Sequence, residues 1–195
     1  ANVMVNEVDR LNRVIMDLIG LSRPSDVSPR PGNVADVVKH VVRLIGQDAE
    51  KRGVEVECKI SREAPKALVD PERMGQALLN LCINALDAMP KGGRLILSAT
   101  RNKKGVCLMV RDTGVGIPPR QLPHIFDPYF TTKGQGTGLG LAMVHKIVEA
   151  HNGEISVVSR QAPPGGQGET LFRIWLPEAL TESQLFVERR KRKRV

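Results

Sequence analysis

The sequence predicts an α+β fold in which a layer of helices covers one face of a mixed sheet. Helical and strand patterns alternate along the chain, but a strand hairpin interrupts them, so the sheet is not purely parallel. Apolar residues make up 41% of the 195 residues and aromatic residues only 3%, so the core must be aliphatic. This length supports one full domain with an appendage, or two small domains.

Residues 1–21 form the first predicted helix. Its apolar side chains recur at intervals of four and three, as in a coiled-coil seam: Met4, Val8, Leu11, Ile15 and Leu18. We expect this stripe to pack on another helix in a bundle or dimer; the alternative is a helix lying on the following domain. Residues 22–33 contain three prolines and a glycine and predict a linker.

Two further helices have predicted N-caps, Asn33 and Asp70, and the second of these caps is followed by Pro71. The predicted buried face of the first, which ends at Gly53, is Val34, Val37, Val38, Val41, Val42, Leu44 and Ile45. The second runs to about Met89 and has the core stripe Met74, Leu78, Leu81 and Ala85. A last helix spans residues 139–151, and the strand patterns occupy residues 54–60, 67–69, 95–99, 106–110, 154–159 and 170–176.

Charge and cysteine content narrow the functional classes. Six of the eight excess positive charges lie at residues 189–194, so the basic character belongs to the tail. A solvated tail is the plain interpretation and DNA or anionic-lipid binding the alternative, although no aromatic residues interleave the run. Cys58, Cys82 and Cys107 lie in apolar runs without paired spacing and predict buried, reduced thiols of a cytosolic protein. No segment resembles a secretory signal or a membrane span.

Asn80, Asn84 and Asp87 form a polar stripe on the helix that begins after Asp70. They are spaced by four and three residues, so they share one helix face. A solvent-facing surface is the alternative interpretation, but such surfaces favour Glu, Lys, Gln and Arg over Asn. Two amide oxygens one turn apart suit Mg²⁺, a hard cation that bridges phosphates.

Asp112 ends an apolar strand, and Gly114 and Gly116 follow it. A carboxylate at a strand end can accept a hydrogen bond from the exocyclic amine of adenine, which guanine lacks at that position. A turn carboxylate without a ligand is the alternative interpretation.

Residues 112–137 predict a long loop of the kind that is usually functional. Its end alternates glycines into the last helix: Gly134, Gly136, Gly138 and Gly140. Such a loop can lay backbone N–H groups against phosphates, and Lys133, beside Thr131 and Thr132, is a phosphate partner. A lid without a ligand is the alternative. The neighbouring aromatics either clamp this lid or form a small satellite core: Phe126, Tyr129 and Phe130.

Four segments, in this order, resemble the N, G1, F and G2 boxes of sensor histidine kinases: residues 80–88, 112–118, 126–133 and 136–141. These kinases belong to the ATPase superfamily of gyrase, the mismatch-repair ATPases and the ninety-kilodalton heat-shock chaperone. The N and F boxes are typical of the nitrogen-regulation-like branch. The resemblance implies a two-layer α/β sandwich of the Bergerat type, with about five strands in a mixed sheet and three helices on one face, preceded by one long helix.

The resemblance also implies a domain organisation and a function. Residues 1–21 would be the second helix of a dimerisation and phosphoacceptor domain, residues 22–33 a linker, residues 34–178 the ATP-binding catalytic domain and residues 179–195 a basic tail. The chain would pass the γ-phosphoryl group of ATP to a histidine, for relay to a response-regulator aspartate. ATP and Mg²⁺ are the implied cofactors.

The site residues follow from the same resemblance. Catalytic roles fall on Asn80, Asn84 and Lys133, and Mg²⁺ on Asn84 with support from Asn80. Nucleotide contacts are implied for Asn80, Asn84, Asp87, Asp112, Gly114, Gly116, Ile117, Thr131, Thr132, Lys133, Gly136, Thr137, Gly138, Leu139, Gly140 and Leu141. The implied partners are a response-regulator receiver domain and, in the full-length protein, a second copy; nucleic acid is not expected. The implied location is the cytoplasm, including the cytoplasmic part of a membrane-bound sensor.

One departure from the family pattern limits this prediction. None of the four histidines has the neighbours of the phosphoacceptor motif, so we expect a fragment that binds ATP without phosphorylating itself. The ATP-hydrolysing branches place a glutamate where Asn80 stands, which favours transfer to an acceptor over hydrolysis. An ATPase that drives conformational change remains the alternative enzyme class.

Overall fold

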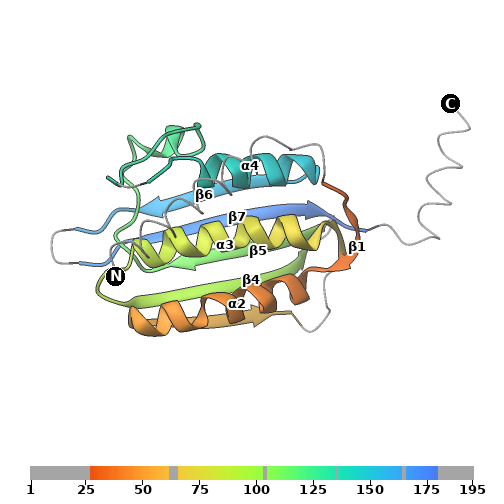
Figure 1. Ribbon diagram of the computed structural model, residues 1–195, viewed down its shortest axis with the longest axis horizontal. Coiled ribbons are helices and arrows are strands. Elements are labelled where there is room, and N and C mark those ends of the chain that lie inside the picture. Colours follow the sequence, from red (N-terminus) through yellow and green to blue (C-terminus); the bar gives the residue numbers. More distant parts are fainter. Residues whose placement is uncertain (1–26, 62–65, 103–104, 135, 164–165, 180–195) are drawn as a thin grey trace, which may run out of the picture.

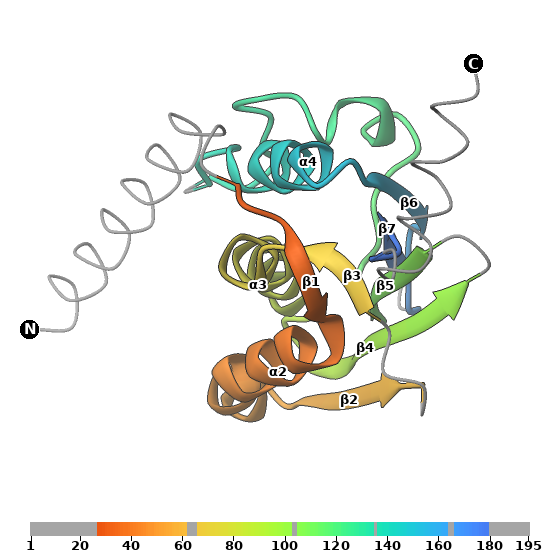
Figure 2. The same cartoon turned by 90° about the vertical axis from the view of Figure 1, so that its right-hand side faces the viewer.

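The structure is a computed structural model that describes residues 27–61, 66–102, 105–134, 136–163 and 166–179. Within these residues three α-helices lie on one face of a five-stranded sheet (Figures 1 and 2). The predicted helix at residues 1–21 and all but the first residue of the predicted tail lie outside the described residues. The elements are β1 (Arg30–Asn33), α2 (Val34–Lys51), β2 (Val54–Ile60), β3 (Lys66–Val69), α3 (Pro71–Asp87), β4 (Gly93–Asn102), β5 (Gly105–Asp112), the 3₁₀ helix η2 (Leu122–His124), α4 (Gly140–Ala150), β6 (Glu154–Arg160) and β7 (Glu169–Pro177).

The five-stranded sheet is mixed, which confirms the predicted fold class. Its order is β2-β4-β5-β7-β6; β2 and β4 run parallel, and the other neighbouring pairs are antiparallel. The register places Asp112, the last residue of β5, between Leu95 of β4 and Thr170 of β7. The central strand therefore ends in a carboxylate that is flanked by a strand on each side.

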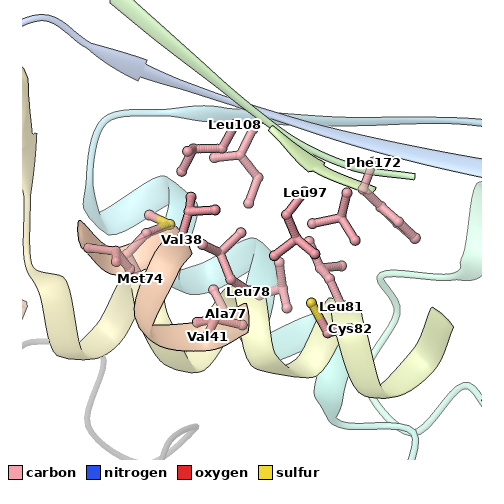
Figure 3. Close-up of a cluster of buried hydrophobic side chains, with 14 of the residues drawn as sticks. Val38, Val41, Met74, Ala77, Leu78, Leu81, Cys82, Leu97, Leu108 and Phe172 are labelled. Carbon is pink, nitrogen blue, oxygen red and sulfur yellow. The ribbon is translucent and has the colours of Figure 1, made fainter. Parts of the chain in front are cut away.

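The apolar face of α3 packs on the centre of this sheet. Met74, Leu78 and Leu81 of α3 are at most 1% exposed, as are Leu97 of β4 and Leu108 of β5 (Figure 3). Burial of one such side chain contributes about 1.5–3 kcal/mol. Because these contacts fix the rotation of α3 about its own axis, they also fix where its polar stripe points.

Both predicted N-caps are confirmed. Asn33 Oδ1 accepts a hydrogen bond from the Ala35 N–H at 3.0 Å. Asp70 Oδ1 accepts hydrogen bonds from the N–H groups of Glu72 and Arg73 at 3.1 and 3.2 Å. These bonds satisfy backbone donors that a helix leaves unpaired in its first turn.

A buried histidine ties α4 to the start of α3. His151 is 1% exposed and follows α4 directly. Its Nε2 accepts a hydrogen bond from the Asp70 N–H at 2.9 Å, so its Nδ1 carries the proton and donates to the Ile147 carbonyl oxygen at 2.7 Å. The two helices that carry the predicted site residues are thus joined at one end.

Part of the predicted linker has a different secondary structure. Arg30–Asn33 form strand β1, which pairs antiparallel with β3 in a separate two-stranded sheet. The prolines and glycine of this segment predict a loop because they weaken strand propensity, but pairing with a distant segment overrides that preference.

Two buried positions were predicted wrongly. Leu44 is 55% exposed, because it lies about 100° around α2 from its buried neighbour Ile45. Cys58 is exposed rather than buried, because β2 is an edge strand and one of its flanks has no neighbour. Cys82 is buried as predicted, and burial raises the pKa of its thiol to about 12. Cys107 is half-buried.

Replacing the cap of α3 should destabilise the domain by about 1 kcal/mol. We expect Asp70→Ala to lower the free energy of unfolding by this amount in urea titrations, because two N–H groups of the first turn and the N–H of Ser28 lose their acceptor. Asp70→Asn keeps an acceptor oxygen and is the matched control. Equal losses in the two variants would contradict the capping role.

Candidate functional site

The polar stripe of α3 begins with Asn80, whose amide nitrogen has no hydrogen-bond partner among the described residues. The Nδ2 atom of Asn80 is buried and unpaired among the described residues. A buried donor in this state costs about 1–3 kcal/mol, and such groups often become satisfied by a ligand or water. A Cβ added at Gly140 would lie 4.0 Å from Asn80 Cγ, so the first residue of α4 lies beside this amide. The amide is positioned to bind something between the two helices.

Lys133, from the glycine loop (residues 131–134 and 136–139), contacts the rest of this stripe. Its Nζ donates hydrogen bonds to Asn84 Oδ1 at 2.9 Å and to Asp87 Oδ2 at 2.7 Å. Asn84 and Lys133, predicted from motifs about fifty residues apart, are therefore side by side. An ammonium group bound by one amide oxygen and one carboxylate shows that these two oxygens can share a cation.

Asp87 has a second partner that the sequence did not reveal. Arg52, the residue after α2, donates from NH1 to Asp87 Oδ1 at 2.8 Å and from Nε to Asp48 Oδ1 at 3.1 Å. Partial burial opposes ionisation of Asp87, but the hydrogen bonds from Lys133 and Arg52 outweigh it and hold its pKa below the usual value. The i, i+4 spacing of Asp48 and Arg52 is visible in the sequence, but the contact across 35 residues is not.

Asp112 is a buried carboxylate, only 4% exposed. Its Oδ1 accepts a hydrogen bond from the Gly114 N–H at 2.9 Å. Its pKa is raised to about 6, mainly by burial and also by the nearby Glu169, while the hydrogen bond from Gly114 opposes the rise. A buried carboxylate with one oxygen left for another donor is costly without a ligand and is typical of a functional site.

The segment after Asp112 approaches neighbouring backbone too closely for a side chain. A Cβ at Gly114 would lie 2.6 Å from the carbonyl oxygen of Ala88, which also accepts a hydrogen bond from the Val115 N–H at 3.0 Å. Gly116 has φ +72° and lies against the backbone of Arg160. This loop is therefore tied both to the end of α3 and to β6.

The sequence motifs did not predict two hydroxyl side chains that lie at this end of the sheet. Ser159 Oγ accepts a hydrogen bond from the Ile117 N–H at 2.8 Å and donates to the Glu169 carbonyl oxygen at 2.8 Å. It also lies 2.9 Å from Oγ1 of Thr170, which is 3% exposed and pairs with Asp112 in the sheet register. The available signal was a polar residue at an inward-facing position of each strand.

The glycine loop leads into a helix without a side-chain cap. Gly138 has φ +68°, and a Cβ there would lie 2.4 Å from the backbone of Tyr129. Thr137 Oγ1 accepts a hydrogen bond from the N–H of Leu139 at 3.3 Å. Among the described residues no side chain caps the first turn of α4, whereas side chains cap α2 and α3. The N-terminus of α4 therefore keeps the partial positive charge and N–H groups that attract an anion.

The remaining predicted residues divide into anchors and exposed positions. Leu139 is buried and Leu141 packs on the core. Thr131 Oγ1 accepts a hydrogen bond from the Lys133 N–H at 3.1 Å, whereas Thr132 and Gly136 are exposed.

The three aromatics of this region do not share one environment. Phe126 packs edge-on against Phe172 of the core, with ring centroids 6.4 Å apart, and Phe130 also packs against the core. Tyr129 is 72% exposed. The two phenylalanines thus join the main core rather than a separate satellite core, and the tyrosine belongs to neither.

Comparison with known proteins identifies the family. A family model described as histidine kinase-, DNA gyrase B-, and HSP90-like ATPase matches residues 69–180, more than half of the chain. The chain belongs to this ATPase family. The matched residues contain all four motifs and the elements α3, β4, β5, α4, β6 and β7.

Relatives of this ATPase domain carry the names of sensor and sporulation kinases. Sensor histidine kinase ZraS of Escherichia coli (strain K12) is 41% identical over 181 residues, which are 93% of this chain and 38% of that protein. Sporulation kinase E of Bacillus subtilis (strain 168) is 29% identical over 177 residues, which are 90% of this chain and 23% of that protein. The chain thus spans less than two-fifths of the length of either relative.

Solved structures of the family confirm the fold. Full-length ShkA in complex with AMPPNP superposes with a TM-score of 0.77 at 28% identity and covers 92% of this chain and 39% of that one. The nucleotide-free catalytic domain of the histidine kinase ThkA has a TM-score of 0.67 at 28% identity and covers 77% of this chain and 95% of that one.

Asp112→Asn should stabilise the ATPase domain without ligand by about 1–3 kcal/mol at pH 8, because it removes a buried charge whose pKa is raised to about 6. In the parent protein the folded state holds the proton more tightly than the unfolded state. Its stability therefore falls as pH rises through about 6, and the gain in the variant should nearly vanish at pH 4. Urea titrations at both pH values test this, with Asp127→Asn on the exposed loop as control. A gain that did not change with pH would contradict the buried charge as its cause.

Proposed function

We propose that this chain is the ATP-binding catalytic part of a protein histidine kinase, which transfers the γ-phosphoryl group of ATP to a histidine on another segment for relay to a response-regulator aspartate. The observation that carries this proposal is the uncapped N-terminus of α4 beside the unpaired amide of Asn80. A helix end with free N–H groups binds phosphates, and the amide supplies a further polar group at the same place. The AMPPNP complex of ShkA supports ATP as the ligand.

The adenine would bind at the end of β5. Asp112 has one oxygen occupied by Gly114 and one left to accept from the exocyclic amine. Ser159 and Thr170 pair with each other next to it and add hydroxyl groups to the same polar end of the sheet. Gly114, Gly116 and Ile117 would form the rim, since backbone there already approaches its neighbours closely.

The metal and triphosphate would bind between α3 and the glycine loop. The oxygen Oδ1 of Asn84 fits Mg²⁺, because it already accepts from a cationic group. The unpaired Nδ2 of Asn80 is a donor and would suit a phosphate oxygen beside the metal. A Mg²⁺ ion held by Asn84 would supply positive charge against the negative charge of the phosphates. Lys133, Thr131 and Thr132 would contact phosphate oxygens, and Gly136–Leu141 would lay backbone N–H groups along them.

The residue choice at Asn80 favours phosphoryl transfer over hydrolysis. An amide cannot take a proton from water as a carboxylate can, so this position does not activate a water molecule. The protein's contribution would then be positioning of the γ-phosphoryl group and electrostatic stabilisation by Lys133 and the α4 N-terminus.

The same proposal includes the wider setting. The partners would be a response-regulator receiver domain and a second copy of the full-length protein, with residues 1–21 in the dimer interface. The location would be the cytoplasm, in a protein that is either soluble or anchored in the membrane by other segments. In the described ranges no helix is long and apolar enough to cross a bilayer.

Two substitutions should separate the roles at the two ends of the site. Asn84→Ala should remove the Mg²⁺-dependent part of the ATP affinity, a loss of about 10- to 100-fold. Asp112→Asn should weaken binding by a similar factor with Mg²⁺ or with EDTA, since it loses a charged acceptor. Isothermal titration of ATP with each variant measures this. Gln47→Ala, an exposed amide on α2, is the control. Parent-like affinity in both variants would refute the site assignment.

Transfer itself is tested by mixing the chain with a separately made acceptor domain, Mg²⁺ and γ-labelled ATP. We expect acid-labile, base-stable phosphate on the acceptor, and none with the Asn84→Ala variant. ATP binding without any transfer to several related acceptor domains would overturn the kinase function and leave an ATP-binding domain of another role.

A further inference from the structure

Arg52 lies outside all four sequence motifs, yet it reaches the edge of the site. It follows α2 and bridges two carboxylates, Asp48 on its own helix and Asp87 on α3. The N–O distances are 3.1 Å and 2.8 Å, and the side chain is 38% exposed. The hydrogen bond that Arg52 donates to Asp87 outweighs desolvation and raises the pKa of Arg52. The guanidinium is therefore a permanent positive charge held at this carboxylate.

Asp87 uses its two oxygens for two different cations. Oδ1 accepts from Arg52, and Oδ2 accepts from Lys133 at 2.7 Å. Two positive groups on one carboxylate repel each other, and each reduces the negative charge that the other experiences. The strength of the Lys133 contact thus depends on Arg52 as well as on Asp87.

Lys133 has to satisfy two demands under the proposed function. Without nucleotide it lies on Asn84 and Asp87. With nucleotide it would contact phosphate, so it must leave Asp87 at a moderate cost. Asp87 retains a counter-ion when Lys133 leaves, because Arg52 stays bound to it.

We propose that Arg52 is a positioning residue that weakens the hold of Asp87 on Lys133 and so sets how readily the glycine loop leaves α3 for the phosphates of the nucleotide. This inference rests on the proposed function for its nucleotide step. Its first step, competition between two cations for Asp87, concerns the protein without ligand. Asp48 modulates the competition, because it draws the guanidinium away from Asp87.

The competition predicts opposite signs for neighbouring substitutions. Arg52→Ala leaves Asp87 to Lys133 alone and should tighten the contact. Asp87→Asn should release Lys133. Asp48→Asn should weaken the contact between Lys133 and Asp87, since Arg52 would then interact with Asp87 alone. If Arg52 only fixed the side-chain conformation of Asp87, removing Arg52 would instead weaken the contact between Lys133 and Asp87. Arg52→Lys separates the two cases further, because it restores the charge but cannot make both hydrogen bonds.

Trypsin cleavage of the native, nucleotide-free chain after Lys133 reports the contact, because the protease must bind the free lysine side chain. Measured by mass spectrometry, cleavage at this bond should slow about two- to five-fold in Arg52→Ala, return to the parent rate in Arg52→Lys, and accelerate by a similar factor in Asp87→Asn and Asp48→Asn. Arg94→Ala is the matched control, since Arg94 also bridges two carboxylates, Glu55 and Glu57, which both belong to strand β2. Raising the salt concentration should shrink every difference.

Acceleration or no change in Arg52→Ala would overturn the proposal, and so would acceleration in Asp87→Asn without any change in Asp48→Asn. Thermal melting confirms that each variant is folded; if Arg52→Ala is not, Asp48→Asn and Arg52→Lys carry the test. A second arm measures Mg²⁺·ATP affinity, which should fall about two- to five-fold in Arg52→Ala. Failure of the parent protein to bind ATP would overturn the proposed function. The cleavage rates would still test whether Arg52 and Lys133 compete for Asp87.

Discussion

The packing of α3 on the centre of the sheet is the contact on which the other features depend. Its leucines meet those of β4 and β5 in a core that is almost free of aromatic groups. This fixes the helix rotation, and the rotation determines where Asn80, Asn84 and Asp87 point. The Asp70 cap and the His151 bridge then fix the start of the helix and its distance from α4. A polar stripe becomes a site only because an apolar stripe on the same helix is fully buried.

The site contains two groups that the fold alone does not justify. Asp112 is a carboxylate at the centre of the sheet, and Asn80 has an unpaired buried amide. Each lowers stability in the absence of a ligand, and each would be paired by the proposed nucleotide. Such places are where a sequence departs from the rules that stabilise a fold, and a binding partner is the usual reason.

Local features of the structure could be predicted from the sequence, whereas features that depend on distant segments could not. Caps such as Asp70, the core stripe of α3 and the β4–β5 hairpin follow from residues close together in the chain. Strand β1, the exposure of Cys58 and the reach of Arg52 to Asp87 depend on which segments become neighbours. The predicted burial of Leu44 was wrong for a local reason, because an apolar residue at the margin of a helix stripe can face either the core or the solvent.

The same limit applies within the site. The motifs predicted Asn84 and Asp87 on one helix stripe and Lys133 in a separate loop, but only the folded chain shows that the ammonium group of Lys133 contacts both side chains. Among the described residues no three His, Cys, Asp or Glu side chains gather to hold a metal ion. The carboxylate that Lys133 contacts at this place is Asp87. Lys133 can occupy the position between Asn84 and Asp87 without a nucleotide, because one carboxylate balances one positive charge. A divalent cation needs more negative charge than this, and in the proposed function the phosphates would supply that charge. The cation and the nucleotide would therefore replace Lys133 together rather than in turn.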